Sequence, residues 1–106
     1  MAKQMVHFDA KNYVDPDGLI VRSGELLARG VLAALRHGDS VHVNLAGLCG
    51  ISSSYFNMFL HTIRTELGAE ALGRVQMEFV SPLQRQVYVR SLEAVLKESG
   101  IALADS

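Results

Sequence analysis

The stretch from Val41 to Leu67, VHVNLAGLCGISSSYFNMFLHTIRTEL, most strongly constrains what this chain can fold into. It begins with an apolar, strand-like segment at residues 41–45 and reaches an amphipathic helix through a loop of small residues and three serines. Apolar side chains recur at offsets of 3, 4, 7 and 11 from Phe56, which predicts the buried stripe of a helix that ends at Gly68. A strand followed by a helix, rather than by a tight turn, predicts a crossover to a parallel neighbouring strand.

The residues before this stretch predict a strand, a hairpin and a helix. Residues 4–8 form a short apolar first strand, and the turn Asp15-Pro16-Asp17-Gly18 lies between the two apolar segments of a small β-hairpin, residues 13–14 and 19–21. Ser23 then has the character of a helix N-cap, and Gly38 that of a helix stop. Within this helix an apolar stripe runs beside Gly30, which we expect to allow close packing on the sheet; the stripe is Leu26, Leu27, Val31, Ala34 and Leu35.

The residues after Gly68 add one strand and one helix. Residues 69–74 form a connector with room for a helical turn, and residues 75–79 alternate as a strand does. Ser81-Pro82 is a cap followed by proline at the first helical position, and it opens a last helix that ends at Gly100. The whole pattern predicts an α/β fold: a mixed β-sheet of about four strands with three main helices packed on it.

Composition limits the classes of protein to which the chain can belong. The chain has 106 residues, of which 49% are hydrophobic, so we expect one domain with a real core. A formal net charge of −1, with scattered basic residues, argues against a nucleic-acid partner. Its single cysteine, Cys49, fits a reducing compartment, and neither a signal peptide nor a membrane-spanning run is evident. We therefore expect a cytoplasmic domain with no membrane partner.

The loop and serines before the central helix have the chemistry of an anion site. The first N–H groups of a helix lack partners and lie at the positive end of its dipole, and Gly47, Gly50 and residues 52–54 precede or open this helix. A phosphate could belong to a bound ligand, or it could be attached to a serine. The simpler interpretation is that one serine caps the helix and that the other two are ordinary loop residues.

The same segment resembles a known family. Residues 44–48, NLAGL, and residues 51–56, ISSSYF, resemble the "DFSGV" and "I-x-x-S-F" segments of STAS domains, the sulphate transporter and anti-sigma factor antagonist domains. The likeness is closer still to a bacterial STAS-like family of unknown function. It covers most of residues 19–96, which would form the core of the domain, and it includes the strand at 75–79.

The resemblance implies a non-enzymatic signalling role. Anti-sigma factor antagonists bind a partner through the start of this helix and are switched by phosphorylation of a serine in a segment like "D-S-S-G". Aligned residue by residue, Ser54 falls on the phosphoacceptor, Ser53 on the serine before it, Ser52 on the acidic residue and Tyr55 on the glycine. The implied partner is a regulatory protein, either a histidine-kinase-like ATPase or an anti-sigma factor.

The expected partner or anion-binding surface adjoins these serines on the loop and the outward helix face. It consists of Gly47, Gly50, Ser52, Tyr55, Asn57, Met58 and His61. The alternative function is a small-ligand or nucleotide sensor that binds a phosphate at the same helix N-terminus.

An enzyme is the least favoured class, because neither a nucleophile–base pair nor a set of metal ligands is visible. We accordingly expect no catalytic residues, no metal and no cofactor. Cys49 is most simply a small loop residue. The edge strand of the N-terminal arm would allow a homodimer.

Overall fold

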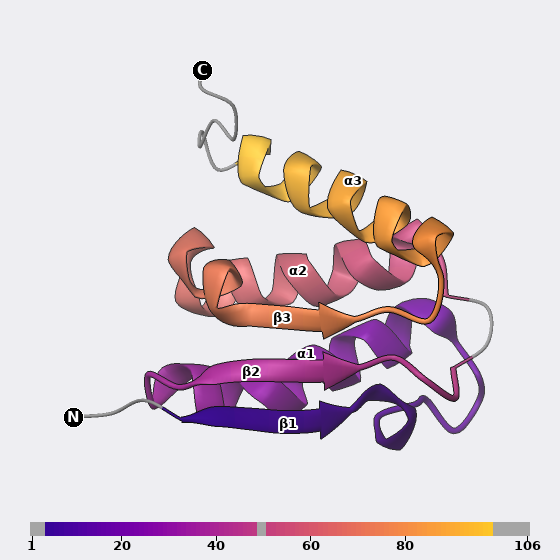
Figure 1. Cartoon of the computed structure of the whole chain (residues 1–106), viewed down its shortest axis with the longest axis horizontal. Coiled ribbons are helices and arrows are strands. Elements are labelled where there is room, and N and C mark those ends of the chain that lie inside the picture. Colours follow the sequence, from indigo (N-terminus) through magenta and orange to yellow (C-terminus); the bar gives the residue numbers. More distant parts are fainter. Residues whose placement is uncertain (1–3, 49–50, 99–106) are drawn as a thin grey trace.

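The computed structural model describes residues 4–48 and 51–98. Within them, strands and helices alternate along the chain (Figure 1). Two short 3-10 helices, η1 and η2, link some of these elements. The order is β1 (Met5–Asp9), η1 (Ala10–Asn12), α1 (Ile20–Arg36), β2 (Ser40–Asn44), α2 (Ser53–Leu67), η2 (Ala69–Arg74), β3 (Val75–Glu78) and α3 (Pro82–Glu98).

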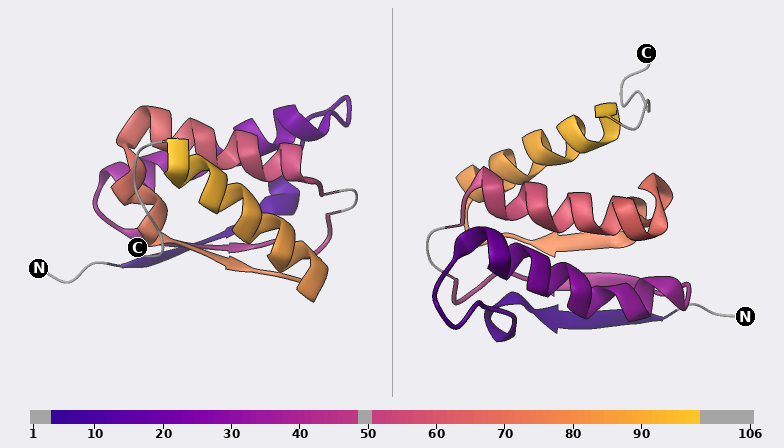
Figure 2. Two further views of the ribbon diagram at one scale, coloured as in Figure 1. Left: turned by 90° about the horizontal axis from the view of Figure 1, so that it is seen from above. Right: turned by 180° about the vertical axis from the view of Figure 1, so that it is seen from behind.

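The sheet is parallel and follows the order β1-β2-β3. Phe8 of β1 lies beside Val43 of β2, which lies beside Met77 of β3. Parallel strands need crossover connections, and two successive crossovers in one direction place both connecting helices on the same face. Accordingly, α1 and α2 lie together across one face of the sheet, and α3 lies alongside α2 (Figure 2).

The opposite face of the sheet, which faces the viewer in Figure 1, has no described helix over it. Parallel sheets are usually covered on both faces, so the side chains on this face are informative. His7 and His42 are in register, with their Nδ1 atoms 3.4 Å apart, and His42 Nε2 lies 3.4 Å from Glu78 Oε1. This face is therefore polar, which suits contact with water.

The core lies between the sheet and the helices. The predicted stripe of α2 is confirmed: Phe56 and Ile63 are among its fully buried side chains, while Leu67 is half-buried. Gly68 ends the helix as expected, with a φ of 89° and an N–H that donates to the Arg64 carbonyl. The other large, fully buried side chains are Leu27, Val31, Leu35, Val41, Val43, Leu45, Phe59 and Leu60.

The predicted hairpin is wrong, although its turn is confirmed. Gly18 has a φ of 78° and its N–H donates to the Asp15 carbonyl. The residues after it open α1 instead of a strand, and Leu19 is the N-cap. Ser23 is therefore not the cap: its hydroxyl, inside the helix, accepts from Asp15 N–H at 2.8 Å and donates to the Leu19 carbonyl at 3.0 Å. These two bonds hold the turn against the first turn of α1.

Glycines mark two close approaches of α1 to its neighbours. We expected Gly30 to pack on the sheet, but a Cβ there would lie 2.4 Å from the ring of Tyr13. Gly24 lies at a helix–helix contact, because an added Cβ would lie 2.5 Å from the backbone carbonyl oxygen of Tyr55. Glycine at this position therefore lets α1 cross the start of α2 at backbone contact distance.

The expected α/β class with three main helices is confirmed, and the sheet is corrected. The described strands are three and parallel, not four and mixed, because the residues assigned to the hairpin belong to a turn and to α1. The packed region also extends before residue 19, since β1 is in the sheet and Ala10 is buried. Ser81 caps α3 as predicted, its hydroxyl accepting from Gln84 N–H at 3.1 Å. Gly100 lies outside the described residues.

None of the helices within residues 4–48 and 51–98 combines the length and the apolar character that a bilayer crossing requires.

Candidate functional site

The predicted site lies where α1 and α2 begin, at the carboxyl ends of β1 and β2 (Figure 1). The loop after β1 and the loop after β2 meet there, because parallel strands deliver their following loops to the same edge. In open α/β sheets, ligands bind outside this edge at a point where the strand order reverses. The described strand order, β1-β2-β3, contains no such reversal, so the site is argued from its residues.

The three serines differ in their surroundings. Ser52 is the N-cap: its extended backbone carbonyl accepts from the N–H groups of Tyr55 at 3.1 Å and Phe56 at 3.3 Å, but its side chain makes no capping bond. Ser53 and Ser54 follow on the first turn and are exposed. The expected phosphoacceptor positions are therefore accessible at the positive end of α2.

Ser54 lies where two open grooves meet. One, the α1/α2 groove, runs between the first turns of the two helices; the other, the α2/α3 groove, runs between α2 and the second half of α3. The α1/α2 groove is lined by Leu19, Ile20, Val21, Arg22, Glu25, Ser52 and Ser54. The α2/α3 groove is lined by Ser54, Asn57, Met58, His61, Ala94, Val95 and Glu98.

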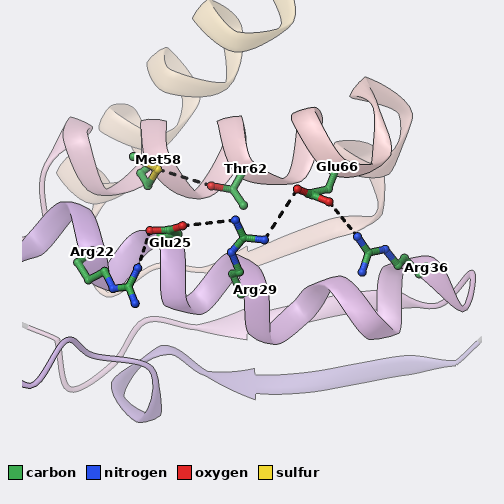
Figure 3. A network of polar contacts seen from close by, with 7 residues as sticks. All are labelled: Arg22, Glu25, Arg29, Arg36, Met58, Thr62 and Glu66. Carbon is green, nitrogen blue, oxygen red and sulfur yellow. Dashed lines mark hydrogen bonds and ion pairs between the residues drawn. The ribbon is translucent and has the colours of Figure 1, made fainter.

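The helix part of the predicted surface is brought together in the α2/α3 groove. Asn57 and His61 are exposed there, and His61 Nδ1 lies 3.2 Å from an Arg64 guanidinium nitrogen. Met58 is half-buried, and its sulfur accepts a hydrogen bond from the Thr62 hydroxyl at 3.6 Å (Figure 3). The Met58 side chain is therefore partly exposed in the groove and partly packed against Thr62 of its own helix.

Sequence reasoning missed the residues that other helices contribute. Leu19 and Val21 are 60% and 43% exposed, large values for apolar side chains, and both line the α1/α2 groove. The sequence predicts a hairpin strand for both residues, and that prediction does not place them beside the serines. Ala94 and Glu98 join the α2/α3 groove from α3, and no local sequence signal marks them.

Tyr55 does not belong to the exposed surface, contrary to expectation. Its side chain is 2% exposed, and its ring lies edge-on to that of Phe56, with centroids 5.6 Å apart. Burial raises the pKa of the Tyr55 phenol well above its ordinary value, so the group is neutral at physiological pH. Tyr55 therefore belongs to the core, one turn before Phe59.

Gly47, the predicted glycine that the structure describes, lines neither of the two grooves. Gly47 has a φ of 88°, and a Cβ there would lie 3.2 Å from Cδ of Lys11. Just before it, the Asn44 side-chain oxygen accepts from Ala46 N–H at 2.9 Å, which tightens the turn after β2. Gly50 and Cys49 lie outside the described residues.

An ion-pair ladder runs along the junction of α1 and α2 (Figure 3). Glu25 pairs with Arg22 at 3.0 Å and with Arg29 at 3.4 Å; Glu66 of α2 pairs with Arg36 at 3.0 Å and with Arg29 at 3.8 Å. These side chains are partly solvated, so each pair contributes at most about 1 kcal/mol. Arg22 stands at the end of the ladder and lines the α1/α2 groove.

Within residues 4–48 and 51–98, no group of three or more histidine, cysteine, aspartate or glutamate side chains is placed to hold a metal ion. The chain matches no protein-family model, no curated protein and no solved structure.

Proposed function

We propose that this protein is a non-enzymatic regulatory module that binds another protein through the starts of α1 and α2. The observation that carries the proposal is the meeting of two open grooves at the exposed Ser54. Exposed apolar side chains border that serine on one side, Leu19 and Val21, and the half-buried Met58 borders it on the other. Apolar groups with a polar rim are typical of a protein–protein contact surface.

The proposed partner is a regulatory protein, a histidine-kinase-like ATPase or an anti-sigma factor, as the STAS-like segment at residues 44–56 implies. The module would act inside the cytoplasm of a bacterium. It would need neither cofactor nor metal, because its output is a change in binding.

Phosphorylation of Ser54, or of Ser53 beside it, would switch the binding. A phosphoserine adds about 1.5 to 2 negative charges, which the first turn of α2 tolerates because of its unpaired N–H groups. Arg22 lines the same groove as Ser54 and pairs with Glu25 at 3.0 Å in the unmodified protein. A phosphate there would compete with Glu25 for this arginine and would add negative charge to the groove.

Arg22 also supports the second candidate, a sensor for a small phosphate-bearing ligand or a nucleotide. It supplies the one guanidinium among the residues that line the α1/α2 groove, next to Ser52 and Ser54. A ligand at about 100 times its Kd should add about 2.7 kcal/mol to stability, so a thermal-shift series with inorganic phosphate and ATP tests this candidate.

Site-specific photo-crosslinking in the native cell tests the partner surface. Leu19 and Leu83 make a matched pair, because both are exposed leucines, at 60% and 68%, at the starts of α1 and α3. A photoreactive residue at position 19 should form a defined adduct with one protein, and the same residue at position 83 should not. Equal adducts from both positions, or none from position 19, would contradict the proposal.

The switch is tested on the partner so identified. Ser54→Asp should weaken its binding, while Ser54→Ala should bind as the unmodified protein does. If Ser54→Asp binds as the wild type does, and phosphopeptide mass spectrometry finds Ser53 and Ser54 unmodified, the switch is excluded while the binding surface stands.

A further inference from the structure

Two histidines from neighbouring strands lie side by side on the face of the sheet that no described helix covers (Figure 1). His7 of β1 and His42 of β2 are 35 residues apart in the chain, and the parallel register makes them direct cross-strand partners. The centroids of their rings are 5.1 Å apart, and their Nδ1 atoms are 3.4 Å apart. His7 is exposed and the side chain of His42 is 27% exposed, so dissolved ions can reach both imidazoles.

The distance between the two Nδ1 atoms fits a shared metal ion. Imidazole nitrogens bind Zn²⁺ at about 2.0–2.1 Å, so two of them at the tetrahedral angle lie about 3.3–3.4 Å apart. At a right angle, as in square-planar and octahedral sites, the same two nitrogens would lie about 2.9 Å apart. The observed 3.4 Å is therefore the spacing of two tetrahedral ligands, and without a metal it accommodates an N–H···N hydrogen bond.

A carboxylate stands behind one of the two imidazoles. His42 Nε2 lies 3.4 Å from Oε1 of Glu78, which is on β3. Because a carboxylate only accepts, this contact places the proton of a neutral His42 on Nε2 and leaves the lone pair on its Nδ1. Metal-binding histidines typically donate their second ring N–H to a carboxylate in this way, which fixes the tautomer and the ring orientation. Three adjacent strands thus supply two metal ligands and one orienting group.

We propose that His7 and His42 bind a divalent ion of the Zn²⁺ class through their Nδ1 atoms, with Glu78 as the positioning residue behind His42. Two protein ligands are fewer than the three or four of catalytic and structural zinc sites, so water completes the coordination and the ion exchanges with the solution. On binding, the proton on His7 Nδ1 is transferred through water to His7 Nε2, so both imidazoles stay neutral.

The bound ion ties the edge strand β1 to the central strand β2. The proposed partner binding does not depend on this ion, because the partner surface is formed by helices on the other face of the sheet (Figure 2). Failure of the metal proposal therefore leaves the proposed function standing, and the reverse also holds.

Titration of the untagged full chain with ZnCl₂, followed by long-range ¹H–¹⁵N NMR of the imidazole nitrogens, tests the site directly. The Nδ1 signals of His7 and His42 should shift at Zn²⁺ concentrations up to about 1 mM. The imidazole signals of His37 and His61 should not. MgCl₂ at the same concentration should shift none of them, because Mg²⁺ prefers oxygen ligands.

Variants of exposed or half-buried side chains separate the roles, with Zn²⁺ affinity measured by calorimetry and folding checked by circular dichroism. His7→Gln and His42→Gln should each reduce the affinity at least about 10-fold, and Glu78→Ala should reduce it about 10-fold. Glu78→Ala should also lower the population of the Nε2–H tautomer of His42 in the metal-free protein. His37→Gln is the matched control and should keep the wild-type affinity, since His37 also lies beside a carboxylate, that of Asp39 at 3.3 Å.

The proposal is overturned if the Nδ1 signals of His7 and His42 do not move at millimolar Zn²⁺, because the pair would then be a hydrogen bond alone. It is overturned equally if His37→Gln lowers the affinity as much as His7→Gln does, since Zn²⁺ would then bind adventitiously to any exposed histidine. An unchanged affinity and an unchanged His42 tautomer in Glu78→Ala would remove the positioning role of Glu78.

Discussion

Gly24→Ala should destabilise the protein, although alanine favours helix more than glycine does. An added Cβ would lie 2.5 Å from the Tyr55 carbonyl oxygen, whereas ordinary contacts begin near 3.4 Å. Both positions are set by helix backbone, so no side-chain rotation relieves the clash, and α1 must move away from the start of α2.

The magnitude follows from two opposing terms. Overpacking of this kind costs about 1–3 kcal/mol, and a contact with fixed backbone belongs in the upper part of that range. Replacing a glycine inside a helix by alanine recovers about 1 kcal/mol. The net loss for Gly24→Ala should therefore be about 1–2 kcal/mol.

Urea unfolding followed by circular dichroism measures this loss. With a slope of about 2 kcal/mol per molar urea, the midpoint should fall by about 0.5–1 M at an unchanged slope. Gly73→Ala is the control, because a Cβ there meets nothing within 4 Å, and it should stay within about 0.5 kcal/mol of the wild type. Gly30→Ala should lose less than Gly24→Ala, since the atoms nearest to its Cβ belong to the ring of Tyr13, which is half-buried and can move. A Gly24→Ala midpoint equal to or above that of Gly73→Ala would refute the reasoning.

Three further predictions concern capping, ion pairs and pH. Ser81→Ala should cost about 1 kcal/mol in urea unfolding because it removes a capping bond, whereas Ser52→Ala, with no such side-chain bond, should cost under about 0.5 kcal/mol; equal losses would contradict the assignment of the caps. Glu66→Gln should cost under about 1 kcal/mol at low salt and nearly nothing in 1 M NaCl, and a larger loss that persists in salt would show that the ladder is more than a surface network. Burial raises the pKa of the Tyr88 phenol above its ordinary value, so the folded state keeps a proton that the unfolded state releases. Stability should therefore be intact below pH ~10 and fall above it by about 1.4 kcal/mol per pH unit for this group. Tyr88→Phe should reduce that slope, and an identical slope in the variant would contradict the assignment.

The features that depend on local periodicity are the ones that the sequence predicts best. The stripe that starts at Phe56 and the stop at Gly68 follow from side-chain spacing and from the φ that glycine allows, and both are present. The parallel crossover from β2 to β3 follows from a strand that leads into a helix, and it is present as well.

The start of α1 could not be predicted in the same way. Short apolar segments beside a turn occur both in hairpins and in first helical turns, so Leu19 and Val21 fit either structure. In the structure, α1 also contacts residues distant in sequence, such as Tyr55, whose carbonyl oxygen would lie 2.5 Å from a Cβ added at Gly24. Propensity and turn chemistry alone do not contain that information.

The candidate site is likewise predicted only in part, because sequence spacing does not show which residues of other helices lie beside it. Ser54, Asn57, Met58 and His61 follow from helical spacing on α2, and they do line one groove. The sequence predicts Tyr55 on the same helix face as Asn57, Met58 and His61, yet it lies one turn before the core residue Phe59 and is buried. The contributions of α1 and α3 to the grooves depend on tertiary packing.

Quantitative affinity purification from the native cell tests the central claim, that the starts of α1 and α2 form a partner-binding surface. The tagged wild type, Leu19→Asp and Leu83→Asp would be compared at equal expression, with the partner-to-bait ratio measured by mass spectrometry. The account predicts one stoichiometric regulatory partner that is retained by Leu83→Asp and lost by Leu19→Asp. Retention of that partner by Leu19→Asp, or its equal loss from both variants, would contradict the claim.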